Sequence, residues 1–161
     1  MTTTAAEKKP THNEEIKTAI PTLAGMISAT MDSGTDHFSE DDNQFLKFHG
    51  SYQQDDRDLR KTSKKYIMMV RGRIPGGVMT AKQWCVFDDL ATQYANNTLR
   101  ITTRQSIQFH GIVMSGLRPL VKKINEALLS TLAACGDVNR NVMASPTPAR
   151  DDPECPTGTD G

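Results

Sequence analysis

The chain has 161 residues, and its 19 basic and 19 acidic side chains give a formal net charge of zero. This length suffices for one domain with a buried core. There is no hydrophobic signal segment at the N-terminus and no apolar run long enough to cross a membrane. The three cysteines, Cys85, Cys135 and Cys155, do not have the spacing of a metal-binding knuckle. We therefore expect a soluble, cytoplasmic protein in a reducing compartment.

The neutral total hides an uneven distribution of charge. Residues 1–60 carry 6 basic and 11 acidic side chains, whereas residues 61–140 carry 12 basic and 4 acidic ones. Residues 141–161 carry 1 basic and 4 acidic side chains. The basic excess coincides with the most regular sequence pattern, which predicts an anionic partner for that segment.

The first 65 residues form two predicted parts. Residues 1–37 are a polar leader with a weak helical pattern, which Pro21 and Gly25 interrupt. Residues 38–65 begin with an apolar anchor around Phe45, continue into a dense polar run and end in a basic linker. This run is either a solvated, charge-paired segment or a specific loop. Its polar side chains are those of Tyr52, Gln53, Gln54, Asp55, Asp56, Arg57, Asp58 and Arg60.

A strand followed by a helix is predicted next. Tyr66–Arg73 has the pattern of a buried strand that becomes cationic at its end, where Arg71 and Arg73 share one face. The Pro75-Gly76-Gly77 step ends the strand, and its glycines permit positive φ. The capping-box spacing from Thr80 to Gln83 predicts a helix over residues 81–95. Its predicted apolar face consists of Trp84, Phe87, Leu90, Ala91 and Tyr94.

Residues 99–113, LRITTRQSIQFHGIV, alternate between apolar and polar side chains. This alternation predicts an edge strand or a hairpin, with Gln105 near the turn. The polar face contains two arginines and no carboxylate, so it suits an anion held by fixed donors. The alternative is an ordinary basic surface strand. The polar residues are Arg100, Thr102, Arg104, Ser106, Gln108 and His110.

A second helix is predicted from Ser115 to Gly136, with an apolar stripe of Leu117, Leu120, Val121, Ile124, Leu128 and Leu132. Residues 137–142 have the pattern of a short strand, and residues 147–161 that of a disordered tail. The resulting order is that of an α+β, ferredoxin-like βαββαβ unit over residues 66–135. Its two helices cover one sheet face. The other face would hold Arg71 or Arg73, the polar hairpin residues and Arg140.

Three blocks together resemble the sulfite/nitrite reductase family. They are FLKFHGSYQQDDRDLR at 45–60, MMVRGRIPGG with TAKQW between 68 and 84, and LRITTRQSIQFHGI with DVNRNV between 99 and 142. The resemblance extends over roughly residues 38–146 and is to the N-terminal part of the family's assimilatory sulfite reductases. It implies a six-electron reduction of sulfite to sulfide, with siroheme bridged to a 4Fe-4S cluster. A polyanionic cofactor and an oxyanion substrate both call for an arginine-rich face.

The resemblance also implies roles for individual residues. Arg73 and Arg140 are similar to the arginines that bind sulfite. Residues 38–65 are similar to a segment that closes around the cofactor, and residues 136–146 to the start of the siroheme and iron–sulfur domain. For His110 we favour contact with a siroheme carboxylate over iron ligation. The residues expected to bind siroheme are Arg100, Thr102, Arg104, Gln108, His110, Asn139, Tyr52, Gln53, Gln54 and Arg57.

The family's paired cluster cysteines have no counterpart here, since Cys85, Cys135 and Cys155 lie in other contexts. We therefore expect no metal ligand in this chain, a 4Fe-4S cluster only in the full-length parent, and no activity of the fragment alone. The parent would take electrons from ferredoxin or from an NADPH-dependent flavoprotein subunit. Neither nucleic acid nor a membrane is an expected partner.

Three alternatives stay open. The chain could be a fragment of the related nitrite reductase, a stand-alone module that binds anions or RNA, or a remnant without function. A module for RNA is disfavoured because Phe109, the aromatic residue of the alternating stretch, has core parity.

Overall fold

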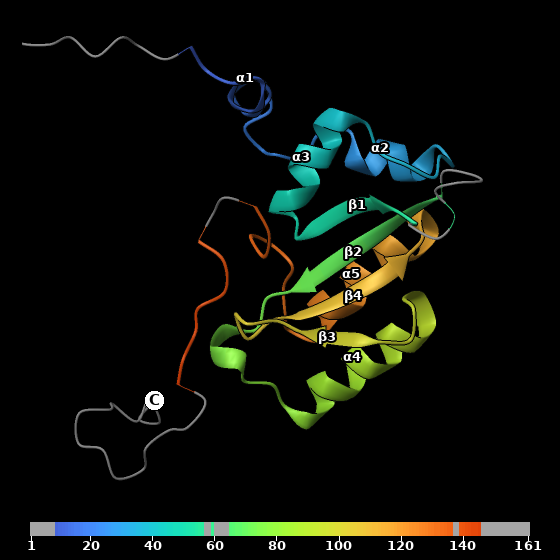
Figure 1. Ribbon diagram of the computed structural model, residues 1–161, viewed down its shortest axis with the longest axis vertical. Helices are drawn as coiled ribbons and strands as arrows, with labels where there is room; N and C mark the ends of the chain where they lie inside the picture. Colours follow the sequence, from blue (N-terminus) through green and yellow to red (C-terminus); the bar gives the residue numbers. More distant parts are fainter. Residues whose placement is uncertain (1–8, 57–58, 60–64, 137–138, 146–161) are drawn as a thin grey trace, which may run out of the picture.

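The computed structural model describes residues 9–56, 59, 65–136 and 139–145. Its centre is an antiparallel sheet in the order β1-β2-β4-β3 (Figure 1). The strands are β1 (Ser51–Asp55), β2 (Tyr66–Gly72), β3 (Leu99–Ile101) and β4 (Ile107–Ile112). Helices α4 (Ala81–Tyr94) and α5 (Met114–Glu126) pack on one face of this sheet, and three shorter helices lie on the β1 side. These are α1 (His12–Ala19), α2 (Ile27–Asp32) and α3 (Glu40–Phe48).

The expected α+β, ferredoxin-like class is confirmed, but one strand comes from a different part of the chain. The fourth strand is β1, within the segment predicted as a cofactor-closing loop, and α3 precedes it. The strand predicted at residues 137–142 is not formed in its described part, residues 139–142. The sequence analysis did not predict β1 as a strand, because its residues are polar and only one of its faces is covered. The predicted tail at residues 147–161 lies outside the described residues.

Helix α4 begins where its capping box predicts. The Thr80 hydroxyl accepts a hydrogen bond from the Gln83 amide at 3.2 Å, and the Gln83 side chain accepts one from the Thr80 amide at 2.9 Å. The apolar face of α4 buries Phe87, whose ring lies 5.0 Å from that of Phe109 on β4. Trp84, which was predicted in the core, is 45% exposed at the edge of this face.

Helix α5 is shorter than predicted. It ends at Glu126, and Leu128 follows with a φ of 60°. The amide of Leu129 donates to the carbonyl of Ile124, which closes the helix C-terminus. Leu128 is therefore 89% exposed and Leu132 48% exposed, so the predicted stripe stops at Ile124.

The alternation over residues 99–110 is confirmed by the pairing of β3 with β4. Leu99 lies opposite Phe109 on the core face, and Arg100 lies opposite Gln108 on the other face. A register shift in the β2–β4 ladder, near Gly111 with its φ of 77°, then reverses the parity. As a result the even-numbered Ile112 is fully buried. Ile101 is the exception on the apolar side, because it is 70% exposed on the edge strand.

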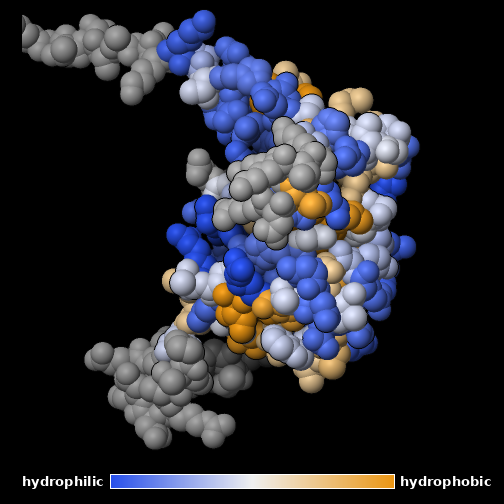
Figure 2. All heavy atoms as spheres, turned by 45° about the vertical axis from the view of Figure 1, so that its right-hand side comes forward, coloured by the Kyte–Doolittle hydropathy of each residue, from blue (hydrophilic) through white to orange (hydrophobic). Residues whose placement is uncertain are grey.

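The surface reflects this division. Figure 2 shows hydrophilic side chains over much of one side and an apolar area low on the molecule, at the height of β3 and α4. Among the described residues, no helix is long and apolar enough to span a membrane.

Candidate anion-binding site

Polar side chains line the sheet face opposite α4 and α5. Arg71 on β2, Gln108 on β4 and Arg100 on β3 are cross-strand neighbours, so their side chains share this face. Tyr52 belongs to it as well, because it pairs with Met69, two residues before Arg71. The register thus gathers donors from four strands on one surface.

Gln108 connects Arg71 to His110. A guanidinium has only donors, so the amide oxygen of Gln108 must turn toward Arg71. In that orientation it accepts from Nε of Arg71 at 3.0 Å and also from Nη2, while its nitrogen donates to Nε2 of His110 at 3.3 Å. Nη1 of Arg71 donates to the carbonyl of Ala134 at 3.2 Å. Arg71 is therefore held on two sides.

His110 is neutral in this network. Burial lowers its pKa below the ordinary value of 6.5, and the charges of Arg100 and Arg71 lower the pKa further. Because Nε2 accepts from Gln108, the proton of the neutral ring lies on Nδ1. His110 consequently adds no charge to the face at neutral pH but can gain one on acidification.

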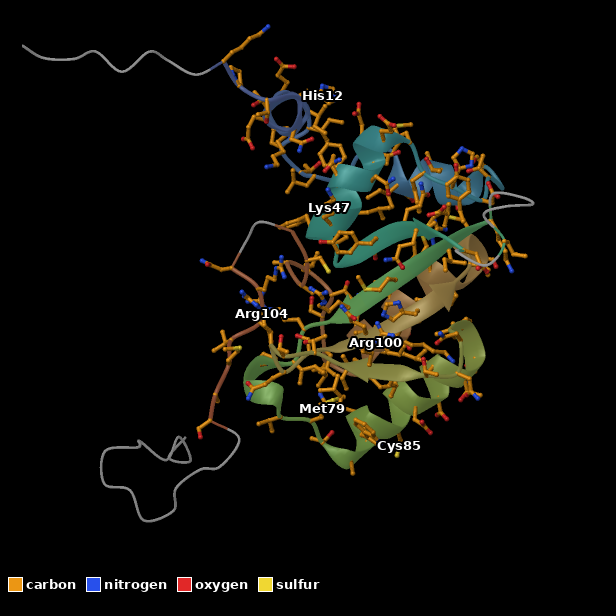
Figure 3. The ribbon with its side chains drawn as sticks, viewed as in Figure 1. His12, Lys47, Met79, Cys85, Arg100 and Arg104 are labelled. Carbon is orange, nitrogen blue, oxygen red and sulfur yellow. The ribbon has the colours of Figure 1, made fainter. Side chains whose placement is uncertain are left out.

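A small cavity of about 110 Å³ opens at one end of this face. Arg71 comes from β2, Arg104 from the turn between β3 and β4, and Arg140 from the segment after α5. Figure 3 shows Arg104 at this end of the sheet, beside the last described segment of the chain. Three cations around so small a volume make the cavity a candidate site for a compact oxyanion. The other lining residues are Thr102, Thr103, Ser106, Ala134 and Asn141.

The turn that carries Arg104 has a defined shape. The Thr102 hydroxyl accepts hydrogen bonds from the amides of Arg104 at 3.3 Å and Ser106 at 3.2 Å. Gln105 adopts a φ of 56°, as a tight turn at the predicted position requires. The turn thereby places the Arg104 side chain at the cavity.

The segment after α5 brings a thiol close to the cations. Cys135 is fully buried, and burial raises the pKa of its thiol. The charges of Arg71 and Arg140 and a hydrogen bond with Tyr52 act in the opposite direction. Since burial is the largest cause, Cys135 stays protonated at neutral pH.

The structure groups most of the residues predicted to bind siroheme or sulfite. Thr102, Arg104 and Arg140 line the cavity, and Arg100, Gln108, His110 and Tyr52 lie on the face beside it, as does Gln54 by its pairing with Ile67. Asn139 is exposed next to Arg140. Arg57 lies outside the described residues.

Gln53 and Arg73 lie elsewhere. The Gln53 side chain is on the opposite face of β1, where its amide bonds both the backbone nitrogen (2.6 Å) and the carbonyl (3.2 Å) of Phe38. Arg73 is half-buried beyond the end of β2, and its amide donates to the carbonyl of Ser130 at 2.6 Å. It is not among the residues lining the cavity.

Of the three arginines that line the cavity, Arg71 is the one that the sequence analysis did not assign to the site. Its shared parity with Arg73 was the available signal, but parity alone cannot rank two arginines on one face. Arg71 rather than Arg73 lies at the cavity, where it contacts Gln108 and Ala134, two residues that are distant in sequence.

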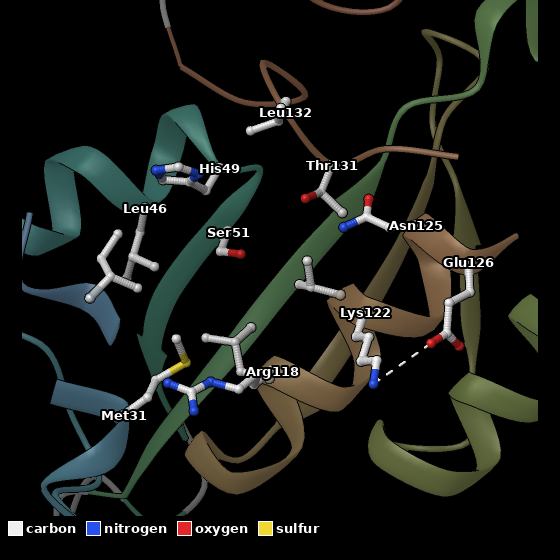
Figure 4. Close-up of a pocket in the computed structure, with 13 residues that line it drawn as sticks. Met31, Leu46, His49, Ser51, Arg118, Lys122, Asn125, Glu126, Thr131 and Leu132 are labelled. Atoms are coloured by element: carbon white, nitrogen blue, oxygen red, sulfur yellow. Dashed lines mark ion pairs between the residues drawn. The ribbon is translucent and has the colours of Figure 1, made fainter. Parts of the chain in front are cut away.

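A wider cavity of about 690 Å³ lies between α2, α3, α5 and β1. Its walls are mainly apolar, and its charged side chains already have partners (Figure 4). Arg118 bonds Asp32 at 2.8 Å, and Lys122 lies 3.8 Å from Glu126. Among the described residues, the cations of this cavity thus have carboxylate partners, whereas Arg71, Arg104 and Arg140 of the smaller cavity form no ion pair.

The described residues contain no group of three or more His, Cys, Asp or Glu side chains that could hold a metal ion. Cys85 is exposed on α4 (Figure 3), whereas Cys135 is buried near the basic face. These two thiols do not fit the ligand set of a 4Fe-4S cluster. Cys155 lies outside the described residues.

The fold is that of a ferredoxin-like half domain, and one face of its sheet is basic. Residues 60–127 match the family model of the nitrite/sulfite reductase ferredoxin-like half domain. The sequence resemblance to that family is therefore confirmed, and this part of the chain is a half domain of the nitrite/sulfite reductase family.

Curated relatives agree with this assignment over most of the chain. The chain is 51% identical over 152 residues to the sulfite reductase [NADPH] hemoprotein beta-component of Anoxybacillus flavithermus, which covers 90% of this chain and 27% of the relative. It is 50% identical over 142 residues to the protein of the same name from Myxococcus xanthus, with coverages of 84% and 25%. The chain thus spans about a quarter of the length of these relatives.

A solved structure supports the fold. The NirA protein of Mycobacterium tuberculosis matches with a TM-score of 0.73 over 88% of this chain and 28% of that protein, at 23% sequence identity. At this level of identity the match concerns the fold alone.

Proposed function

We propose that this chain supplies the siroheme- and oxyanion-binding face of a sulfite reductase, an oxidoreductase that reduces sulfite to sulfide. The observation that carries the proposal is the cavity between Arg71, Arg104 and Arg140, which is sized and charged for a small oxyanion. The relatives named sulfite reductase hemoprotein support sulfite as that oxyanion. Nitrite reductase is the second candidate, because the matching family model includes both activities.

The chemistry of the donors fits siroheme, which has many carboxylates. Arg100, Arg104 and Arg71 offer guanidinium groups that pair with carboxylates through charge-assisted hydrogen bonds. Tyr52, Thr102 and neutral His110 add donors that bring no further repulsion among cations. When bound, siroheme would supply the iron at which electrons reach the oxyanion. The residues of this chain would bind and orient the cofactor and hold the oxyanion.

The names of the relatives indicate the class of electron donor. They are beta-components of an NADPH enzyme, which favours an NADPH-dependent flavoprotein over ferredoxin as the donor. The 4Fe-4S cluster of the family does not fit the described cysteines, so no step through it is assigned to these residues. A cytoplasmic location and the absence of nucleic-acid partners remain predictions.

A visible-absorption titration of the full chain with siroheme tests the proposal. Saturable binding at one siroheme per chain, weakened by competing sulfate, is the expected result. The Arg118→Ala variant is a matched control, because it removes one arginine that pairs with Asp32 away from the basic face. An unchanged siroheme spectrum would contradict the proposal. If Arg118→Ala lowers siroheme affinity as much as the loss of an arginine on the basic face does, binding reflects general charge only.

A further inference from the structure

One buried amide in the cavity wall joins three segments of the chain. Asn141 is only 9% exposed, and its Nδ2 lies 2.6 Å from the carbonyl oxygen of Ile74. The same nitrogen lies 2.9 Å from the carbonyl of Arg104 and 3.2 Å from that of Gln105. The loop after β2, the β3–β4 turn and the segment after α5 are thus linked through a single side chain.

The other end of this amide is left without a partner. Among the described residues, nothing donates a hydrogen bond to the buried Oδ1 of Asn141. An unsatisfied buried acceptor costs about 1–3 kcal/mol, a cost that a leucine of similar size would avoid. Packing alone therefore does not explain an amide here, whereas the donor contacts of Nδ2 do.

These contacts fix the neighbouring arginine. Arg140 directly precedes Asn141, and its Nε donates to the carbonyl of Gly136 at 3.0 Å. On the other side of Asn141, the carbonyl of Val142 accepts from the amide of Gly76 at 2.8 Å. Asn141 and Arg140 line the same cavity, together with Arg104, whose carbonyl Asn141 binds.

We propose that Asn141 is a positioning residue that sets the guanidinium of Arg140 against that of Arg104 and keeps the cavity preformed for an oxyanion. The inference rests on the proposed function, since it concerns the same cavity. Preformed contacts bind more tightly because less ordering is required when the ligand arrives. Asn141 itself need not contact the anion.

Two variants and a control separate positioning from general stability. Asn141→Ser shortens the side chain, and Asn141→Leu removes the amide at similar volume. Gln105→Ala is the control, because the Gln105 amide ties the same segment through Ala144, with contacts of 2.6 and 2.9 Å, but does not line the cavity. Sulfate affinity of the full chain is measured by calorimetry at constant ionic strength, and unfolding by circular dichroism.

We expect sulfate to bind about tenfold more weakly to both Asn141 variants, as for a lost charge-assisted contact, and within about twofold of normal to Gln105→Ala. In ¹⁵N spectra, sulfate should shift the Nε resonance of Arg140 in the unmodified chain but not in the variants, while Arg71 still responds in both. A purely structural role would lower thermal stability without this selective spectral loss.

The outcomes separate the two proposals. If the unmodified chain binds no sulfate, both the cavity function and the role of Asn141 are overturned. If it binds sulfate and the folded variants bind it equally well, the role of Asn141 alone is overturned. If both variants are unfolded, Asn141 serves the whole fold, and the positioning role is likewise rejected.

Discussion

The amide of Gln108 holds the guanidinium of Arg71 by accepting from both Nε and Nη2 across the β2–β4 ladder. Together with the carbonyl of Ala134 on Nη1, this contact orients the guanidinium at the edge of the cavity. A guanidinium that is already ordered loses little freedom when an anion binds. Arg71 should therefore contribute more to anion binding than an arginine of equal charge without such contacts.

The comparison of Arg71→Ala with Arg73→Ala tests this expectation. We expect Arg71→Ala to weaken sulfate binding by about 1.5–3 kcal/mol, the range for a hydrogen bond to a charged group. Arg73→Ala should have a smaller effect, because Arg73 does not line the cavity. Calorimetric titration of both variants measures the difference. A larger loss of sulfate affinity in Arg73→Ala would contradict this expectation and favour Arg73, the arginine that the family resemblance assigned to sulfite binding.

Arg104 should contribute directly to the binding of siroheme. Replacing it with alanine removes a cation at the β3–β4 turn without altering the Thr102 contacts to the turn backbone. The expected loss in siroheme affinity is about 1.5–3 kcal/mol. Absorption titrations of the Arg104→Ala and Arg118→Ala variants provide the measurement and its charge-matched control. Unchanged affinity in Arg104→Ala would remove Arg104 from the site.

His110 should make stability depend on pH. Its pKa in the folded chain lies below the ordinary 6.5, so near and just below that pH the unfolded chain binds more protons. The free energy of unfolding should therefore decrease as the pH falls through about 6.5. Urea unfolding between pH 5 and 8 should show a weaker decrease in His110→Gln.

A second histidine, His12, acts on the pH dependence of stability in the opposite direction. The hydrogen bond and charge of Asp41 raise the pKa of His12, so this pair stabilises at low pH and loses its effect as the pH rises through the folded pKa. Because His12 is present in both proteins, its contribution cancels in the comparison. A His110→Gln profile parallel to that of the unmodified chain would contradict the prediction.

Gly50 should be intolerant of a side chain. Its φ is +76°, and an added Cβ would collide with the carbonyl oxygen of Thr131 and lie 3.1 Å from that of Arg71. Gly34 has a similar φ of +79° but open space around it. Gly34→Ala should cost about 1 kcal/mol from backbone strain alone. Gly50→Ala should cost clearly more, and equal values in urea unfolding would show that the contact with Thr131 relaxes easily.

The local signals were sufficient for the parts of the fold that local interactions determine. The capping box at Thr80 and the alternation from Leu99 to His110 led to the correct helix start and the correct faces. The β1 strand was not predicted, because the sequence of a polar strand with one covered face resembles that of a loop. The early end of α5 was not predicted, because Leu128 continues the apolar spacing of the helix. Its φ is nevertheless positive, so the helix has already ended there.

The composition of the basic face was easier to predict than which of its residues line the cavity. A face rich in arginine and free of carboxylate is visible in the sequence of the hairpin. The choice between Arg71 and Arg73, and the placement of Gln53 on the covered face, depend on strand register and on distant partners such as Ala134 and Phe38. Contacts between residues that are distant in sequence produce no periodic pattern, so a single sequence does not reveal them.

The short edge of the sheet also limits what else the domain can do. In the order β1-β2-β4-β3, the outer edge on one side is β3, which is only three residues long and carries the exposed Ile101. A foreign strand adding there could form at most about three backbone hydrogen bonds before the chain turns away. The β3 edge thus presents an apolar side chain while offering little template for pairing with another chain.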